Sequence, residues 1–368
     1  MSDSICRFGI LGTAGIARKN WKAMRLAGNS SVTAVASRSV ENAQRFISQC
    51  SAEVPQQQPP QAFGCYQEML DSDLIDAVYI PLPTALRHPW VIRASEAGKH
   101  VIAEKPAAIS TAQLTEMLDA CRQHGVQYMD GVMFMHSQRL PLIHQIVHVR
   151  QELGQVHRMA SQFCFAGGEE FSRTNIRTDT SLEPHGCLGD LGWYCIRMFY
   201  YLMSEQLPVE VRGRALSPMQ GTTSQGTVPG EFSAELRFAN GVSAVFYNSF
   251  RTAHQQWLHV SGSEGYLQVD DFVLPYCGSE LAAYVGHDHF MIDNTRFHME
   301  SHRQRHVVYE YDAGHHSAQE VRMLTAIAGQ VLSGSLNQRW PQWALHTQMI
   351  QDACFASALR DGAAVQLP

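Results

Sequence analysis

The clearest indication of the fold is Gly9-Ile-Leu-Gly12-Thr-Ala-Gly15-Ile-Ala17, which joins a short apolar strand to a helix through a glycine-rich turn. We expect the strand over Cys6–Leu11 and the helix over Gly15–Ala27. Such a turn lets a pyrophosphate approach the backbone and directs helix N–H groups toward it. Ala14 stands where a dinucleotide fingerprint usually has its second glycine. We interpret the turn as a cofactor-binding loop, and a ligand-free strand–helix turn is the alternative.

Outward from this turn, the first 130 residues alternate apolar strands with helices of 10–15 residues. The polar, Pro-rich stretch Pro55–Gln61 interrupts them as a surface loop. This rhythm predicts βαβ units, and hence a doubly wound parallel sheet of the Rossmann type over residues 1–130. The further strands are expected at Val32–Ser37, Ala77–Ile80 and His100–Ala103, and the helices at Val40–Cys50, Thr84–Ala97 and Thr111–His124.

Beyond residue 130 the pattern changes to that of an α+β domain, which we assign to residues 131–368. Strand-like runs joined by short turns fill Pro208–Tyr276, and Asn240-Gly241 between two of them is a strong hairpin signal. Consecutive strands joined by short turns predict an antiparallel sheet. Helices are expected at Leu140–Glu152, Leu188–Met203, Ala318–Leu332 and Trp343–Leu359.

Composition excludes several classes of protein. The 368 residues are 45% hydrophobic and carry a formal charge of −6, so the chain is neither disordered nor basic enough for nucleic acid. No apolar run reaches the ~18 residues of a membrane span, and the N-terminus lacks the features of a signal peptide. The nine cysteines are an odd number without C-x-x-C spacing. We therefore expect a cytoplasmic protein with reduced, mostly buried thiols.

The end of the second strand indicates which nicotinamide cofactor binds. An NAD site places an Asp or Glu there to accept from the ribose 2′-hydroxyl. This chain has Ser37-Arg38-Ser39 instead, and its first acidic residue in that region is Glu41. An arginine beside hydroxyl groups suits a 2′-phosphate. The sequence therefore favours NADP over NAD, and a surface arginine is the alternative.

Lys105 is the first candidate for the chemistry. It is one of only four lysines and follows the apolar strand His100–Ala103, at the edge where open α/β sheets bind ligands. A lysine there can donate to a substrate oxygen and lower the pKa of a neighbouring acid. A solvated surface lysine is the alternative.

A second constellation lies in Gly186-Cys-Leu-Gly-Asp190-Leu-Gly-Trp-Tyr194-Cys-Ile-Arg197, where a helix is expected to begin. Asp190 and Tyr194 are four residues apart and share one helix face. A tyrosine whose pKa is lowered by a nearby cation serves as a general acid or base. The alternative is structural, with Asp190 as a helix cap and Tyr194 in the core.

Two other groups of residues have a structural interpretation. Seven of the 18 histidines lie between 287 and 316, and His298, His302 and His306 would share a helix face able to bind zinc. We favour a solvated loop or strand there, because no apolar face supports a helix. Cys187 and Cys195 flank the second constellation and are read as packing residues.

Over nearly its whole length, the chain resembles the glucose–fructose oxidoreductase/inositol dehydrogenase (Gfo/Idh/MocA) family. Tyr194 stands where many members have histidine, as in the branch with glucose–fructose oxidoreductase, dimeric dihydrodiol dehydrogenase and NADP-dependent xylose dehydrogenases. The segments that carry the resemblance are GILGTAGIARK at 9–19, AVASRS at 34–39, DAVYIPLPTALRHPW at 76–90, GKHVIAEKPAA at 98–108, MDGVMFMHSQR at 129–139, NIRTD at 175–179, GCLGDLGWYCIR at 186–197 and VSGSEGYLQVDDFVLPY at 260–276.

The resemblance implies an NADP-dependent oxidoreductase that transfers a hydride at a carbinol or carbonyl carbon of an aldose, cyclic diol or related polyol. Tyr194 would be the general acid or base, Lys105 would hold its phenolate and the substrate oxygen, and Asp190 would orient them. Arg177 and Trp193 are candidate substrate residues, with a surface charge pair and core packing as their alternatives. No metal is implied. The resemblance also implies that the C-terminal sheet is large, open and mostly antiparallel, and that a homodimer or higher oligomer forms through it. The implied cofactor residues are Gly12, Thr13, Ala14, Gly15, Ile16, Ser37, Arg38, Pro81, Leu82, Thr84, His88, Glu104 and Lys105.

Two other functions stay open on the sequence. One is an enzyme with tightly bound NAD(P) that uses transient oxidation for hydrolysis, elimination or internal oxidoreduction. The other is a non-catalytic nucleotide sensor. The presence of both Lys105 and Tyr194 favours the dehydrogenase over the sensor. Substrate identity and reaction direction are not determined by these residues.

Overall fold

The computed structural model describes residues 5–368 and forms two compact units. The first contains residues 5–136 together with Asp179–Pro184 and Ala313–Met349. The second contains Ser137–Thr178, His185–Asp312 and Ile350–Pro368. Each unit is therefore built from separate stretches of chain, whereas the expected boundary after residue 130 divides the sequence once. That boundary stays a prediction.

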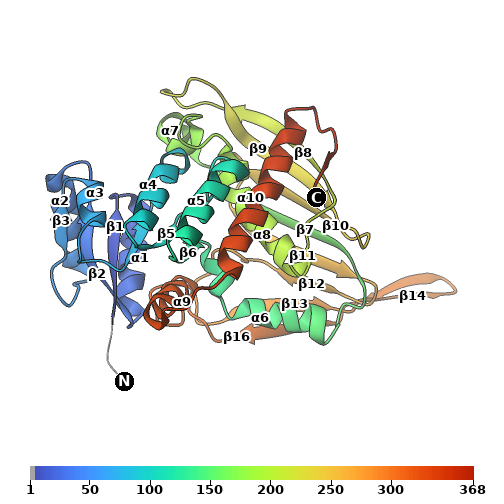
Figure 1. Ribbon diagram of the computed structural model, residues 1–368. Helices are drawn as coiled ribbons and strands as arrows, with labels where there is room; N and C mark the ends of the chain where they lie inside the picture. Colours follow the sequence, from blue (N-terminus) through green and yellow to red (C-terminus); the bar gives the residue numbers. More distant parts are fainter. Residues whose placement is uncertain (1–4) are drawn as a thin grey trace. The chain divides into compact units, whose positions relative to one another are not determined.

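The first unit is built on a six-stranded parallel sheet with the order β3-β2-β1-β4-β5-β6 (Figure 1). This order is that of the dinucleotide-binding fold, so the predicted Rossmann sheet is confirmed. Its β2 strand begins two residues earlier than expected, and β3 adds a short edge strand at the end of the Pro-rich loop. The strands are β1 Cys6–Leu11, β2 Ser30–Ala36, β3 Gln61–Phe63, β4 Ala77–Ile80, β5 His100–Ala103 and β6 Tyr128–Asp130.

Helices pack against this sheet with buried apolar stripes. Ser39 and Ser110 cap α2 and α5 by accepting hydrogen bonds from the backbone N–H groups of Asn42 (3.4 Å) and Gln113 (3.3 Å). From the far end of the chain, α9 returns to contact α1, β1 and β2. The helices are α1 Gly15–Leu26, α2 Val40–Glu53, α3 Tyr66–Leu70, α4 Thr84–Glu96, α5 Thr111–Gln123, α9 Gln319–Ser333 and the first part of α10 Arg339–Ala358.

The second unit is built on a nine-stranded sheet with the order β16-β13-β12-β11-β7-β10-β9-β8-β17. All neighbours are antiparallel except β7 and β10, which are parallel, so the expected mostly antiparallel sheet is confirmed. The predicted hairpin joins β9 and β10, with Gly241 at φ +87°. The strands are β7 Val156–Cys164, β8 Glu210–Met219, β9 Val228–Arg237, β10 Ser243–Ser249, β11 Gln255–Gly262, β12 Tyr266–Val269, β13 Leu281–Gly286, β16 Arg303–Val308 and β17 Val365–Gln366.

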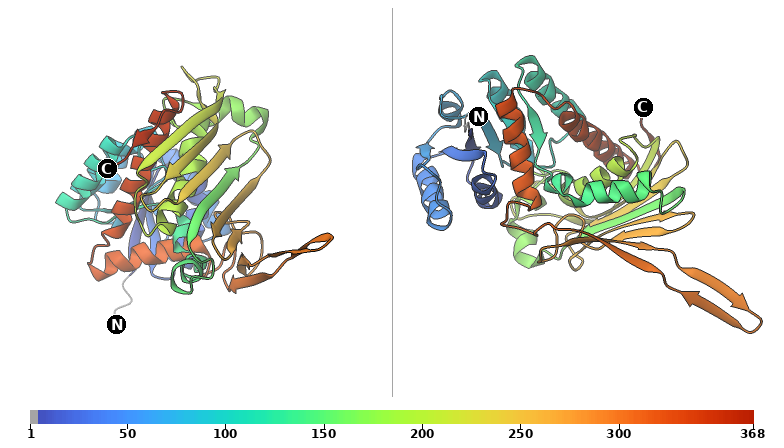
Figure 2. Two further views of the ribbon diagram at one scale, coloured as in Figure 1. Left: turned by 90° about the vertical axis from the view of Figure 1, so that its right-hand side faces the viewer. Right: turned by 90° about the horizontal axis from the view of Figure 1, so that it is seen from below.

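One face of this sheet carries helices. The almost wholly buried α8 contacts β7, and α6 contacts β13 and β16. The other face is turned toward the viewer in the left view of Figure 2. A separate two-stranded ribbon of β14 His289–Asp293 and β15 Arg296–Glu300 projects beyond the sheet edge. The helices are α6 Arg139–His144, α7 Gly168–Thr174, α8 Trp193–Leu202 and the last part of α10.

Two predicted helices differ in detail from the structure. The helix expected over Leu140–Glu152 is the short α6 followed by a π-helical turn, Gln145–Val149. A second π-helical turn, Leu188–Gly192, precedes α8, so regular α-helix begins at Trp193 rather than at Leu188. Among residues 5–368, no helix combines the length and apolarity that crossing a membrane requires.

Candidate active site

The β1–α1 turn has the backbone geometry of a phosphate cradle. Gly12 has φ +111°, and its N–H donates to the carbonyl oxygen of Ala36 (2.9 Å). The positive φ strongly favours glycine, and a Cβ at this position would also lie 3.1 Å from Leu82 Cδ2, so that the Leu82 side chain would have to shift. Ala14 has φ −65° and ψ 153°, which any L-residue adopts, so alanine fits where the fingerprint usually has glycine.

The N-terminus of α1 is open to an anion. Ala14, the N-cap residue, offers no side-chain acceptor, and the first turn contains no acidic residue. The partial positive charge of the helix end is therefore not neutralised by the helix itself. Ile16 on this turn is 44% exposed, although it is a large apolar residue. The predicted cofactor residues of this segment thus form one continuous turn, which consists of Gly12, Thr13, Ala14, Gly15 and Ile16.

The end of β2 places Arg38 close to this turn. Ser37 is buried and its N–H donates to the carbonyl oxygen of Phe63 (3.1 Å), whereas Arg38 is exposed and forms no ion pair within residues 5–368. Burial raises the pKa of the Tyr66 phenol, and the nearby Arg38 charge lowers it. The Tyr66 hydroxyl in turn lies 3.9 Å from the position of a Cβ on Gly12. Tyr66, which the sequence did not single out, links the two predicted parts of the cofactor site.

Glu104 and Lys105 directly follow β5, with a cis peptide bond between Lys105 and Pro106. The Glu104 carboxylate accepts hydrogen bonds from the Tyr79 hydroxyl (2.6 Å) and from Asn20 Nδ2 (3.4 Å). Burial, and next the Glu104 charge, raise the pKa of Tyr79 well above its usual value. Tyr79 therefore stays a proton donor to Glu104, which is fixed beside the half-buried Lys105.

Arg87, which the sequence analysis missed, holds the backbone around Lys105. The side chain is 3% exposed, and its guanidinium donates to the carbonyl oxygens of Glu104, Lys105 and Pro106 and, through Nε, to that of Leu82 (2.7 Å). Burial lowers the pKa of Arg87. One buried cation thus ties the loop after β4 to the loop after β5. Its sequence signal is weak, because an arginine on a predicted helix normally faces solvent.

Two other predicted cofactor residues on α4 have protein partners. The backbone N–H and hydroxyl of Thr84 donate to the Glu183 carboxylate, at 2.9 and 2.6 Å. The His88 ring lies 2.6 Å from the Glu116 carboxylate on α5. Pro81, at the end of β4, is buried. Of the residues predicted from this segment, Leu82 is the one whose side chain lies against the β1–α1 turn.

In the second unit the structure brings Arg177 and Asp190 together. Arg177 Nε lies 2.8 Å from Asp190 Oδ2, and the Asp190 side chain is 11% exposed. Asn175 Oδ1 accepts from the Arg177 backbone N–H (3.0 Å) and holds this segment in place. The charge pair that was the alternative for Arg177 therefore exists, and its partner is the predicted orienting carboxylate.

Tyr194 and Trp193 lie at the start of α8, just after the π-helical turn that carries Asp190. Tyr194 is 6% exposed and its ring is 5.6 Å from that of Phe163. Trp193 has no exposed surface, and the Arg197 guanidinium lies 5.9 Å from its ring. Core packing, the alternative for Trp193, thus describes its side chain in this structure, and its contact with substrate stays a prediction.

The two cysteines near this turn are packing residues, as predicted. Burial raises the pKa of Cys195 to about 12 and that of Cys187 well above its usual value. Cys195 Sγ accepts hydrogen bonds from Ser161 Oγ (3.4 Å) and Asn248 Nδ2 (3.5 Å). A thiol held in this way is not a nucleophile at neutral pH.

The histidines that could have shared a helix face are separated on strands. His298 is on β15, His306 is on β16, and His302 lies between these two strands. Within residues 5–368, no group of three or more His, Cys, Asp or Glu side chains is arranged to hold a metal ion. The segment thus consists of strands and a connecting loop rather than a helix, in agreement with the solvated loop or strand expected there.

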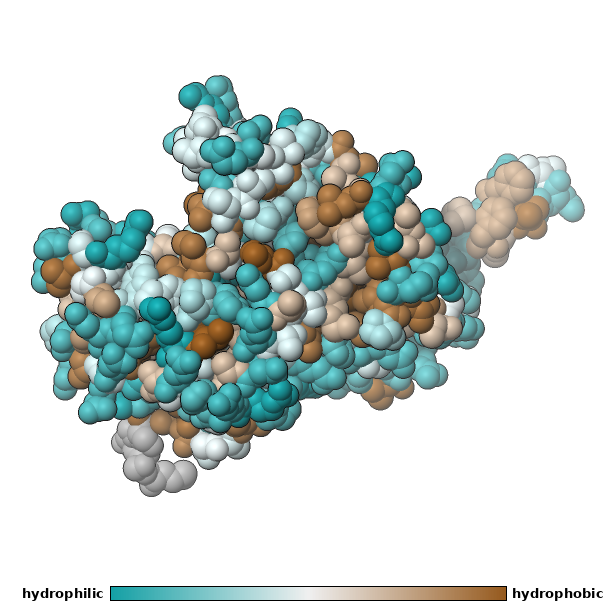
Figure 3. Space-filling model, turned by 45° about the horizontal axis from the view of Figure 1, so that its top comes forward, coloured by the Kyte–Doolittle hydropathy of each residue, from teal (hydrophilic) through white to brown (hydrophobic). Residues whose placement is uncertain are grey.

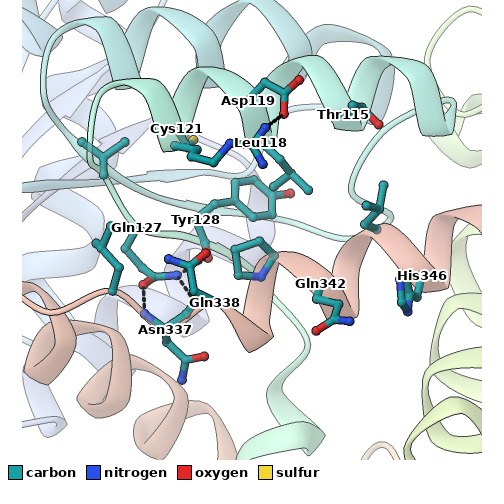
Figure 4. Close-up of a pocket in the computed structure, with 15 residues that line it drawn as sticks. Thr115, Leu118, Asp119, Cys121, Gln127, Tyr128, Asn337, Gln338, Gln342 and His346 are labelled. Carbon is teal, nitrogen blue, oxygen red and sulfur yellow. Dashed lines mark hydrogen bonds and ion pairs between the residues drawn. The ribbon is translucent and has the colours of Figure 1, made fainter. Parts of the chain in front are cut away.

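A cavity of about 360 Å³ lies between α5 and the start of α10 and is lined by none of the predicted site residues (Figure 4). The Gln127 side chain donates to the carbonyl oxygens of Tyr128 (2.7 Å) and Asn337 (3.0 Å), and its oxygen accepts from the Asn337 N–H (2.6 Å). This amide therefore anchors the segment before α10 to β6. The residues that line this cavity come from 115–128 and 336–346, and none of them belongs to the β1–α1 turn.

Comparison with known proteins identifies both parts of the chain. Residues 6–132 match the model of an oxidoreductase family with an NAD-binding Rossmann fold, and residues 144–268 match the GFO/IDH/MocA C-terminal domain. The chain is 32% identical over 278 residues to dTDP-3,4-didehydro-2,6-dideoxy-alpha-D-glucose 3-reductase from Streptomyces violaceoruber, covering 74% of this chain and 75% of the relative. It is 31% identical to D-xylose 1-dehydrogenase (NADP(+)) 2 from Haloferax volcanii, covering 72% and 75%.

The fold is shared with solved structures. A 3-ketoreductase from Actinomadura kijaniata, in complex with NADP and TDP-benzene, superposes with a TM-score of 0.76 at 24% identity over 96% of this chain and 98% of that one. A levoglucosan dehydrogenase in complex with NADH and L-sorbose gives a TM-score of 0.80 at 18% identity over 99% of each chain. At these identities the likeness concerns the fold alone.

Proposed function

Because the chain belongs to the GFO/IDH/MocA family of oxidoreductases, we propose that it is an NADP-dependent dehydrogenase or reductase of a sugar or related polyol. Its substrate class is an aldose, a cyclic diol or a related compound with a reactive carbinol or carbonyl carbon. Named relatives support both parts of this proposal. They include a xylose dehydrogenase and a scyllo-inositol dehydrogenase that carry NADP(+) in their names.

The observation that carries the proposal is the cradle formed by the β1–α1 turn. Gly12 has the positive φ and lacks the Cβ that would fill the cradle, and the end of α1 has no acid of its own to repel a pyrophosphate. Arg38, exposed at the end of β2, supplies positive charge for a 2′-phosphate where an NAD site would have a carboxylate. These residues fit a dinucleotide with a phosphorylated ribose.

The roles of the chain's own residues follow from their chemistry. When bound, NADP supplies nicotinamide C4 as the hydride donor or acceptor. Tyr194 takes the hydroxyl proton of the substrate in oxidation and returns a proton to the carbonyl oxygen in reduction. Lys105 donates to that oxygen and stabilises the negative charge that develops on it. Arg87 fixes the backbone from which Lys105 extends.

Asp190 and Arg177 form the polar part of the substrate site in the second unit. Their ion pair at 2.8 Å leaves Asp190 with one oxygen committed to Arg177, so the carboxylate has a fixed direction. A fixed carboxylate orients a sugar hydroxyl by accepting its hydrogen bond. Arg177, which is 38% exposed, donates to substrate oxygens from the same pair.

Two copies of the chain pair through the large sheet of the second unit in this proposal. The sheet face that does not carry the buried side chains holds a cross-strand row of half-buried ones, formed by Tyr247, Gln162 and Trp257. Tyrosine and tryptophan are enriched at protein interfaces, because they combine a large apolar area with a polar group.

The proposal is tested by cofactor binding followed by turnover. Protein freed of nucleotide is titrated with NADPH and with NADH while nicotinamide fluorescence is recorded. We expect tighter binding of NADPH, and then NADP-linked turnover in a screen of aldoses, cyclic diols and nucleotide-linked keto sugars. Preference for NADH, or nucleotide that cannot be exchanged during turnover, contradicts it.

A further inference from the structure

The β14–β15 ribbon has no core of its own. We call residues 288–301 the arm. Nine of the ten side chains in its two strands are exposed, and His298 is half-buried. A turn at Asp293–Arg296 closes the arm, where the Thr295 N–H donates to Asp293 Oδ1 (3.2 Å). An isolated two-stranded hairpin is marginally stable in water, so an arm of this kind gains stability from a covering surface.

The two faces of the arm differ sharply in composition. Opposite residues on antiparallel strands share a face, and the register pairs Phe290 with Met299 and Ile292 with Phe297. One face is therefore wholly apolar, with its four side chains 58 to 76% exposed. Phe290 and Phe297 stack across it at 5.7 Å. The other face holds the remaining pairs, His289–Glu300, Met291–His298 and Asp293–Arg296.

The base of the arm continues the edge hairpin of the large sheet. β13 and β16 pair with each other. Gly286 lies opposite Arg303 at the end next to the arm, and Leu281 lies opposite Val308 at the far end. The Tyr266 hydroxyl and the His302 N–H both donate to the Asp288 carboxylate, at 2.8 and 3.1 Å, and fix the point where the arm leaves the sheet. Figures 1 and 2 show the arm running away from the sheet, and Figure 3 shows apolar surface on it.

A second exposed apolar surface lies at the opposite end of the same edge hairpin. Tyr309 and Tyr311 follow β16 and are 77 and 45% exposed, while Glu310 between them is buried and accepts from the Gln138 N–H (2.6 Å). The loop carrying Leu274 and Tyr276, which are 39 and 58% exposed, is joined to this segment by two hydrogen bonds between Gly278 and Asp312. We call Leu274, Tyr276, Tyr309 and Tyr311 the tyrosine patch.

The arm and the tyrosine patch of one chain cannot meet, because β16 separates them. Its six residues span roughly 20 Å at ~3.3 Å per residue, and the arm points away from the patch. A second copy related by a two-fold axis at this edge presents its patch where the first copy presents its arm. The same operation brings the second arm to the first patch, which gives a closed, isologous contact.

We propose that the apolar face of the arm packs on the tyrosine patch of a second copy of this chain, with both arms engaged in a symmetric pair. The areas agree with such a pair. At ~150–250 Å² for a large side chain, the arm face and the patch each expose on the order of 500 Å². Two arm–patch contacts then bury about 2,000 Å², the size of a stable interface. The contact involves a different part of the molecule from the sheet-face pairing proposed above.

The test measures self-association by sedimentation over a dilution series of the full-length chain. Phe297→Ser removes the most exposed side chain of the apolar face, and Tyr309→Ser removes that of the patch. Each is expected to raise the dissociation constant of the arm-dependent assembly step roughly tenfold or more. Met291→Ser is the matched control, since Met291 is exposed on the same arm but belongs to its polar face. It is expected to associate as the wild type does.

Mixing the two variants identifies which surfaces meet. A pair formed from Phe297→Ser and Tyr309→Ser chains keeps one intact arm–patch contact, so the mixture is expected to associate more tightly than either variant alone. Circular dichroism confirms that each variant is folded. An unchanged dissociation constant for Phe297→Ser overturns the proposal. So does wild-type association by Tyr309→Ser, which would mean that the arms pack on some other surface.

Discussion

Arg38 is the residue on which selection between the two nicotinamide dinucleotides depends. It is exposed at the end of β2 with no ion pair inside the described chain, so its charge is available to a 2′-phosphate. A charge-assisted contact contributes about 1.5–3 kcal/mol. We therefore expect Arg38→Ala to raise the Michaelis constant for NADP roughly 10- to 100-fold and that for NAD little. The control is Arg45→Ala, because Arg45 is also an exposed arginine but lies further along the chain, on α2. Equal effects on both cofactors would remove Arg38 from the 2′-phosphate site.

Tyr194 carries the proton transfer in the proposed reaction, and its hydroxyl can be removed with little change in packing. The ring is buried against Phe163, a contact that phenylalanine at 194 retains. We expect Tyr194→Phe to lower kcat by ~10²–10⁴-fold while NADPH binding is unchanged, since general acid–base catalysis contributes on that order. Tyr201→Phe, which loses a hydrogen bond of 3.4 Å to Leu140, is the control on the same helix. A retained turnover rate would exclude Tyr194 as the acid or base.

Single residues also mark the limit of what the sequence could predict. The β1–α1 turn was predictable because glycine at a strand–helix junction reflects a local backbone requirement. Arg87 was not, because its role depends on carbonyl oxygens 17 to 19 residues away that only the folded sheet brings within reach. Glu183, which holds Thr84 from 99 residues away, was missed for the same reason.

At the level of elements, the start of β5 contains a titratable hydrogen bond. His100 Nδ1 accepts from the Gln127 N–H (2.9 Å), which requires the unprotonated ring nitrogen. Burial lowers the pKa of His100, and the Asp76 charge partly offsets this. Below about pH 6.5 the unfolded chain therefore binds the proton more readily than the folded one. The free energy of unfolding should fall as pH falls through this range and level off below the lowered pKa.

Urea unfolding between about pH 5 and pH 8 measures this dependence. His100→Asn keeps an acceptor without the titration, so we expect a shallower loss of stability on acidification. The loss should not vanish, because burial also lowers the pKa of His148, His185 and His259. His157→Asn, at an exposed position on β7, should retain the wild-type slope. Parallel curves for wild type and His100→Asn would contradict the assignment.

Elements differed in how far they could be predicted. Four strands of the first unit, β1, β2, β4 and β5, are short, apolar and bounded by turns, and the sequence predicts them as part of a parallel sheet. The three-residue edge strands β3 and β6 were not predicted. β7 was missed, although it lies in the middle of the nine-stranded sheet. Its pairing with β10 and β11, more than 80 residues further along the chain, decides its strand conformation, and its own sequence VHRMASQFC does not alternate cleanly. The arm was expected only as a solvated loop or strand and not as a hairpin, because its apolar face has no partner within the chain's own core.

At the scale of the whole molecule, each compact unit is assembled from distant stretches of chain. The first unit holds every predicted cofactor residue before position 106, yet Ala313–Met349 belongs to it. A local pattern cannot indicate this return, since the helix periodicity of α9 shows an apolar stripe but not the surface that the stripe covers. The structure shows that surface to be α1, β1 and β2.

The return of α9 makes a prediction about a shortened chain. Four apolar side chains of α9 are each at most 2% exposed, namely Val321, Met323, Leu324 and Ile327. At ~2 kcal/mol for each side chain, their burial contributes about 8 kcal/mol to the stability of the folded chain. That is comparable to the whole stability of a typical domain, ~5–15 kcal/mol.

A chain ending at Asp312 should therefore fail to bind NADPH and aggregate, although it retains every predicted cofactor residue. A chain in which Asn-Gly replaces residues 289–300 loses only the arm and should bind NADPH as the full chain does. NADPH fluorescence titration and light scattering compare the two. Binding by the chain ending at Asp312 would show that the first unit folds without its C-terminal cover.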